Sequence, residues 1–95
     1  MRLDEALADP EWTAAPDLQG EAYQDLPPAI ILDADETVLD NTPYAAADVL
    51  AGEPFSPDRW NAWASAGVAK AVPGAVDFTR AAAAKGVKVF YVTNR

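Results

Sequence analysis

The chain has 95 residues, 51% of them hydrophobic, and its 15 acidic and 7 basic side chains give a formal net charge of −8. This length allows one small domain at most, the apolar fraction excludes a disordered chain, and the acidic balance argues against a nucleic-acid partner, which needs a basic face. The absence of cysteine and histidine excludes disulfides, Cys/His zinc sites and serine–histidine triads.

The first 28 residues predict little regular structure. Residues 3–9 fit one or two helical turns ended by Pro10, and the prolines and glycine of residues 10–28 are typical of a linker. The opening stretch carries acids where a signal peptide would be apolar, and no run approaches the roughly 20 apolar residues of a membrane span. We expect an N-terminal helix remnant and linker over 1–28, with no signal peptide or membrane span in this chain, followed by a core over 29–95.

Two strands flank this core. Residues 29–33, Ala-Ile-Ile-Leu-Asp, predict a short strand buried on both faces, and the β-branched and aromatic residues 87–94 predict a second buried strand. Before the second strand, residues 73–85 predict a helix that starts at a proline and stops at Gly86.

The segment between the first strand and this helix is more polar and richer in turns. Helical turns are plausible at 43–51 and 57–66, and the second has Ser56 as a candidate N-cap and Pro57 at its first position. The order is therefore strand, insertion, helix, strand, which is a βαβ unit with two parallel strands. We expect an α/β fold.

Acidic and hydroxyl side chains follow both strands. Asp33 and Asp35 come at the end of the first strand and Thr93 at the end of the second. Ligands of such sheets bind at the carboxyl ends of the strands, so these three side chains should converge. Two neighbouring carboxylates repel each other unless a cation lies between them, and Mg²⁺ prefers carboxylates together with phosphate oxygens. This pattern favours phosphoryl transfer through an aspartyl-phosphate.

Three other interpretations of the acidic pair compete with this one. A solvated turn is the simplest, because aspartate is common in turns. A calcium loop requires glycine and glutamate where this chain has Val38 and Tyr44. A phospho-receiver domain usually has adjacent acids, with the phosphorylated aspartate on another strand.

Three blocks of sequence resemble one known family. The run "LDADETVLDN" carries the DxDxT signature of the haloacid dehalogenase (HAD) superfamily, as Asp33, Asp35 and Thr37. The run "VFYVTNR" is similar to that superfamily's second motif. Together with "AVPGAVDF", they resemble the class C (subfamily IIIB) acid phosphatases, the bacterial outer-membrane lipoprotein acid phosphatases and nucleotidases.

The resemblance implies a partial Rossmann-like (HAD-type) parallel sheet with an inserted helical cap at about 41–72. It implies that Asp33 is the nucleophile, that Asp35 is the general acid and base, and that Mg²⁺ binds the Asp33 carboxylate and the Asp35 backbone carbonyl. It further implies phosphate contacts from Thr93 and Asn94. The expected partner is a small-molecule phosphomonoester, nucleoside monophosphates among them, outside the cytoplasm.

Residues around these motifs have further expected roles. The family's pattern suggests that Trp60 stacks on the substrate, whereas Trp60 and Trp63, three apart on a helix, also fit packing of the cap on the core. Asp40 and Asn41 are expected to shape the turn into the cap, and Glu36 to face solvent. A phosphate contact and terminal disorder both fit Arg95. The candidate site therefore consists of Asp33 and Asp35, as catalytic and metal-binding residues, with Thr93, Asn94 and Trp60 as substrate-binding residues.

The family's third motif, with a lysine, and its fourth, with acidic metal ligands, have no counterpart after Arg95. We therefore expect an incomplete piece of an enzyme that is marginally folded or self-associates and shows little turnover alone. The alternatives are a catalytically inactive interaction segment and a HAD-type phosphotransferase.

Overall fold

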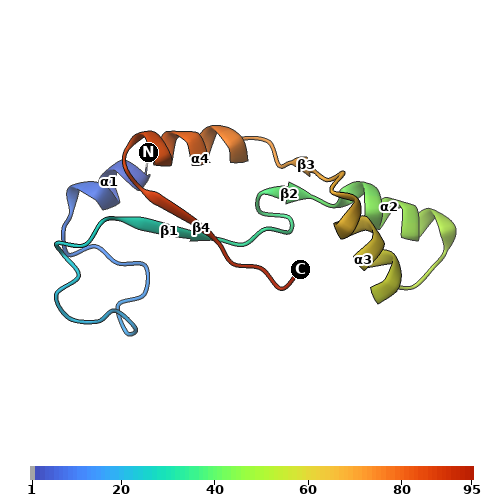
Figure 1. Ribbon diagram of the computed structural model, residues 1–95, viewed down its shortest axis with the longest axis horizontal. Coiled ribbons are helices and arrows are strands. Elements are labelled where there is room, and N and C mark those ends of the chain that lie inside the picture. The colour runs from blue at the N-terminus through green and yellow to red at the C-terminus, as the bar shows by residue number, and fades with distance from the viewer. Residues whose placement is uncertain (1) are drawn as a thin grey trace.

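The computed structural model describes residues 2–95, and Figure 1 shows them as a chain of short elements strung along one long axis. Helices and strands alternate in an α/β order. The elements are α1 (Arg2–Ala8), β1 (Ala29–Leu32), β2 (Leu39–Asp40), α2 (Thr42–Ala51), α3 (Pro57–Ala66), β3 (Lys70–Ala71), α4 (Ala75–Ala84) and β4 (Lys88–Tyr91).

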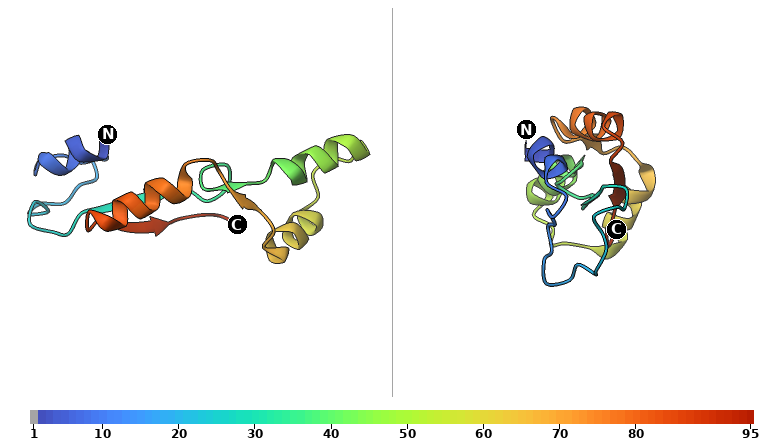
Figure 2. Two further views of the ribbon diagram at one scale, coloured as in Figure 1. Left: turned by 90° about the horizontal axis from the view of Figure 1, so that it is seen from above. Right: turned by 90° about the vertical axis from the view of Figure 1, so that its left-hand side faces the viewer.

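The parallel pair of β1 and β4 confirms the predicted βαβ unit. Ala29 is the register partner of Lys88, and Leu32 is the partner of Tyr91, so the two carboxyl ends lie at the same edge. The helix α4 leads into β4 and runs beside the two strands in the left view of Figure 2. Gly86, at φ 77°, then reverses the chain into β4, a conformation that favours glycine.

A second, antiparallel pair closes the segment between the two strands. Leu39 pairs with Ala71 and Asp40 with Lys70, so residues 41–69 leave and re-enter the fold at one place. We call this segment, which holds α2 and α3, the helical excursion. The Ser56 hydroxyl accepts a hydrogen bond from Arg59 N at 3.4 Å, as expected of an N-cap. The position of the helical excursion agrees with the insertion expected at about 41–72. Its role as a helical cap over the active site stays a prediction.

The prediction that both strands are buried on both faces is wrong. Ile31 is 72% exposed and its register partner Phe90 is 50% exposed, and both side chains lie on the same face of the sheet. The physical reason is coverage: within residues 2–95, α4 packs beside this two-stranded sheet and leaves the face of Ile31 and Phe90 open. The sequence pattern shows what the strands are suited to bury, and not what this chain places over them.

The molecule is correspondingly extended. The radius of gyration is 17.3 Å and the principal extents are 51 × 27 × 19 Å, against a radius of about 12 Å for a compact domain of this length. The helical excursion lies at one end and α1 with its linker at the other. In the described part of the chain, no helix has the length and apolarity to cross a membrane.

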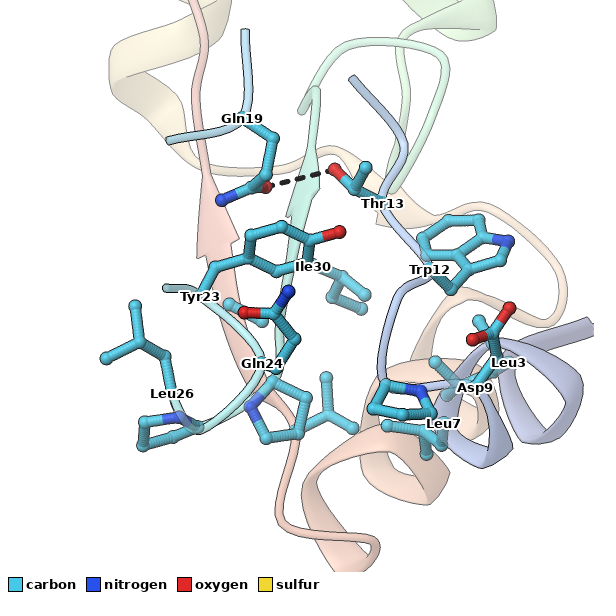
Figure 3. Close-up of a pocket in the computed structure, with 16 residues that line it drawn as sticks. Leu3, Leu7, Asp9, Trp12, Thr13, Gln19, Tyr23, Gln24, Leu26 and Ile30 are labelled. Carbon is cyan, nitrogen blue, oxygen red and sulfur yellow. Dashed lines mark hydrogen bonds between the residues drawn. The ribbon is translucent and has the colours of Figure 1, made fainter. Parts of the chain in front are cut away.

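The N-terminal segment forms an open pocket of about 440 Å³ against the start of β1 (Figure 3). Trp12, Tyr23 and Ile30 line it, and the Thr13 hydroxyl donates to Gln19 Oε1 at 3.0 Å on its rim. Its lining comes from α1, the linker and the amino end of β1, whereas the acidic pair follows the carboxyl end of that strand. The pocket is therefore separate from the predicted site.

Candidate active site

The strand ends bring Asp35 and Thr93 together. Val92 N donates to Leu32 O at 2.9 Å, which extends the parallel pairing to the last residues of both strands. The Thr93 hydroxyl then lies 3.5 Å from Asp35 Oδ2 and donates to it. The expected convergence at the carboxyl edge is present in the structure for these two side chains.

A tight turn after Asp33 fixes the backbone of Asp35. The carbonyl oxygen of Ala34 accepts from the N–H groups of Val38 and Leu39, both at 2.9 Å. Glu36 adopts the left-handed conformation at φ 57°, and its N–H donates to Leu39 O at 2.8 Å. Ala34, the first residue of this turn, is buried. The chain thus folds back within six residues and directs Asp35 toward the start of the helical excursion.

The carboxylate of Asp35 is held by three residues. Its Oδ1 accepts from Asn41 Nδ2 at 2.8 Å and from Arg95 Nε and Nη2 at 3.1 and 2.6 Å, while its Oδ2 accepts from Thr93. The Arg95 guanidinium lowers the pKa of Asp35 below its ordinary value, with the Asn41 amide and the Thr93 hydroxyl adding to the effect against partial burial. The arrangement favours the ionised form of Asp35.

Asn41 joins this acid to the helical excursion. Its side-chain oxygen accepts from Trp63 Nε1 and from Arg95 Nη2, both at 2.8 Å, and its N–H donates to Glu36 Oε1 at 3.2 Å. The residue is 3% exposed. The sequence predicts that Asn41 shapes the turn, but it does not predict this larger network, because two of its partners are 22 and 54 residues away in sequence. The Trp63 bond supports the packing interpretation of that tryptophan.

Asp33 has a contrasting environment. Its Oδ1 accepts from the adjacent Ala34 N at 2.7 Å, the residue is exposed, and no other described residue forms a hydrogen bond with its side chain. Asn94 is also exposed, without a side-chain hydrogen bond to the described residues. One carboxylate of the pair is therefore occupied by the protein, and the other is open to a ligand.

Arg95 lies against the protein's own acid, with its guanidinium bonded to Asp35. Its guanidinium carbon lies 5.3 Å from the ring centroid of Trp60, which is within cation–π range. Tyr44 meets the same tryptophan edge-on, at 5.3 Å between ring centroids. Trp60 thereby lies next to the Asp35 cluster, although it comes from α3.

The donor types around Asp33 suit magnesium. A carboxylate and a backbone carbonyl are the hard oxygen ligands that Mg²⁺ prefers, with water and phosphate oxygens completing its shell. Asp33 offers the open carboxylate, and Asp35 follows two residues later. Among residues 2–95, however, no three Asp, Glu, His or Cys side chains gather to hold a metal on their own. The residues present fit a metal that draws part of its shell from substrate.

Positive charge near the pair comes from Arg95. The lysines lie elsewhere. Lys85 forms an ion pair with Asp4 at 2.6 Å, and Lys88 begins β4, at the amino end of the sheet. Lys70 is the register partner of Asp40 in the β2–β3 ladder. The lysine that the resemblance leads one to expect has no equivalent beside Asp33 in the part of the chain described.

Comparison with known proteins places this geometry in a family. The family described as HAD superfamily, subfamily IIIB (Acid phosphatase) matches residues 6–95. The class C acid phosphatase from Bacillus anthracis is 39% identical, with a TM-score of 0.78 over 99% of this chain and 34% of that one. The structure of the Bacillus anthracis class C acid phosphatase with tungstate bound is 39% identical, with a TM-score of 0.74 over 98% and 33%. The chain thus spans about a third of these solved relatives.

Proposed function

Because the chain belongs to subfamily IIIB of the HAD superfamily, the acid phosphatases, we propose that it carries the nucleophile and the acid–base residue of a Mg²⁺-dependent phosphomonoesterase. The observation that supports this most directly is the asymmetry of the pair: Asp33 is open to a ligand, and Asp35 is held by Asn41, Thr93 and Arg95.

In the proposed reaction, an Asp33 oxygen attacks the phosphorus atom and the ester P–O bond breaks. Asp35 gives its proton to the leaving oxygen, which departs as the alcohol. The Asp35 carboxylate then takes a proton from a water molecule, which attacks the phosphorus, and the P–O bond to Asp33 breaks. Inorganic phosphate leaves, and Asp35 is protonated again.

The Arg95 contact bears on the two roles of Asp35. The guanidinium stabilises the carboxylate, which is the form that activates water, and disfavours the protonated form that serves the leaving oxygen. An acidic medium restores the protonated form, in keeping with an acid phosphatase.

Further residues contribute to substrate binding in this proposal. On substrate binding, the Thr93 hydroxyl would turn from Asp35 and donate to a phosphoryl oxygen, as the Asn94 amide does, and Trp60 offers an aromatic surface to a nucleobase. The Asp33 carboxylate and the Asp35 backbone carbonyl would hold Mg²⁺, which supplies positive charge against the phosphoryl oxygens. The tungstate of the solved relative is a tetrahedral oxyanion like phosphate and supports this choice of substrate class. The family's setting outside the cytoplasm belongs to the same proposal.

Substitution of the nucleophile tests the proposal. Phosphate release from p-nitrophenyl phosphate and from a nucleoside 5′-monophosphate is measured with Mg²⁺ and with EDTA, for the chain, for Asp33→Asn and for Asp25→Asn. We expect a low Mg²⁺-dependent rate, because none of residues 2–95 places a lysine beside Asp33. Asp33→Asn should remove it by a factor on the order of 10³ or more, and Asp25→Asn, an equal charge change in the linker, should leave it unchanged.

Trapping the intermediate gives a second readout that does not depend on turnover. Borohydride reduces an aspartyl-phosphate to homoserine, so peptide mass spectrometry after reaction with a phosphoryl donor should find homoserine at position 33. An Asp33→Asn chain with the full rate, or a chain with neither turnover nor trapped homoserine, would contradict the proposal and favour a non-catalytic interaction segment. Phosphate transfer to added glycerol would identify a phosphotransferase instead.

A further inference from the structure

Arg95 lies at the junction of the acid, the helical excursion and β4. Its Nε and Nη2 both donate to Asp35 Oδ1, and Nη2 also donates to Asn41 Oδ1 at 2.8 Å. The guanidinium carbon lies over the ring of Trp60. The side chain is only 18% exposed although the residue follows β4 in an open stretch.

We propose that Arg95 is a positioning residue that fixes the orientation of the Asp35 carboxylate, and that Trp60 supports Arg95 in this task. The orientation of the acid would then depend on the placement of α3. This inference rests on the proposed function of Asp35 and deepens it.

The first argument is the closure of the network. Arg95 donates to Asp35 and to Asn41, and the Asn41 amide donates to Asp35, so the three side chains form a ring of hydrogen bonds. Members of such a network reinforce one another, and loss of one loosens the other two. Without Arg95, Asp35 would keep the Asn41 bond and the long 3.5 Å contact with Thr93.

The second argument is the chemistry of the guanidinium. A planar group can place two N–H donors on a carboxylate while its face rests on an aromatic ring. A lysine ammonium in the same place carries the charge without this fixed fork. The position therefore requires arginine by shape as well as by charge.

The third argument is the origin of the support. Trp60 belongs to α3, and α3 is tied to the same cluster by the Trp63 bond to Asn41. Movement of α3 would withdraw the ring from Arg95 and the indole donor from Asn41 together. A leaving group that binds near Trp60 would in this way affect the orientation of the acid that serves it.

The test measures the Asp35 side chain directly, without metal or substrate. Three-bond couplings from Asp35 Cγ to its backbone nitrogen and carbonyl carbon report the side-chain rotamer by NMR. We expect single-rotamer values in the unmodified chain and averaged values in Arg95→Gln and Arg95→Lys. Trp60→Leu should shift them in the same direction, and Trp60→Phe should largely restore them. Lys85→Gln, which loses an ion pair with Asp4 away from the helical excursion, is the control and should change nothing at Asp35.

Unchanged Asp35 couplings in Arg95→Gln or in Trp60→Leu would overturn the inference. If Arg95→Gln disturbs the backbone spectrum of β1 and β4, the comparison of Arg95→Lys with the unmodified chain decides alone. Because the readout involves no turnover, its failure leaves the phosphatase proposal untouched, and loss of the phosphatase proposal leaves the couplings unaffected.

Discussion

At the residue scale, two aspartates with one residue between them have different environments. The sequence was sufficient to locate both and to bring Thr93 to the same edge, because strand ends in a parallel pair meet. It did not predict that Arg95 and Asn41 would donate hydrogen bonds to the Asp35 carboxylate, since those contacts span 60 and 6 residues and leave no local pattern in the sequence. The two carboxylates therefore differ: that of Asp33 is open to a ligand, and that of Asp35 is hydrogen-bonded to the protein.

The buried Asn41 gives a prediction at this scale. Asn41→Ala removes the partner of Trp63 Nε1, Asp35 and Arg95 at once, and it leaves donors unsatisfied in a partly buried cluster. We expect a loss of about 1–3 kcal/mol in the free energy of unfolding, measured by urea titration of tryptophan fluorescence. The exposed Asn61→Ala on α3 is the control and should fall within about 0.5 kcal/mol of the unmodified chain. Equal stabilities of the two variants would show that the cluster contributes nothing.

At the element scale, periodicity and end signals predicted the helices well, and pairing of the short strands was not predictable. Ser56 and Pro57 mark the start of α3, and Gly86 follows the end of α4, as expected from local rules. The β2–β3 ladder has only two residues on each side, Leu39–Asp40 and Lys70–Ala71. Such strands carry no period of their own, and their pairing depends on the fold of the residues between them.

The start of α2 gives a prediction about pH. Asp40 Oδ1 accepts from Thr42 N at 2.9 Å, and Thr42 lowers the pKa of Asp40 below its ordinary value. A lowered pKa in the folded state means that the carboxylate stabilises the fold above the unfolded pKa of about 3.9, and that this contribution is lost as pH falls through the folded pKa. We expect the first turn of α2 to loosen as the medium is acidified below about pH 4.

Amide hydrogen exchange of residues 42–46 between pH 3 and pH 6 checks this, after correction for the intrinsic rate. Asp40→Asn should abolish the acid-dependent step because an amide oxygen accepts the same bond without titrating. Asp77→Asn, in the first turn of α4, is the matched control and should preserve the step in α2. A step that survives in Asp40→Asn would assign it to another group.

At the scale of the whole molecule, the open face of the sheet governs behaviour. Ile31 and Phe90 are register partners on one face, and Val92, two residues on, continues it at 62% exposure. The strands β1 and β4 also form a two-stranded sheet whose outer edges have no strand partner among the described residues. Exposed apolar strands with free edges are templates for association between chains.

We therefore expect the chain to self-associate with rising concentration, and the formal charge of −8 sets the direction of the salt effect. Like charges repel at low ionic strength and are screened at high ionic strength, so added salt should promote association. Sedimentation velocity from micromolar to millimolar chain, with and without 0.5 M salt, measures this.

Paired Ile31→Thr and Phe90→Thr substitutions keep β-propensity and remove apolar area, and they should shift the chain toward monomer. Leu50→Thr, 88% exposed on α2, removes similar area away from the sheet and should not. A monomer that unfolds cooperatively at all these concentrations would show that two strands and a flanking helix suffice without a partner.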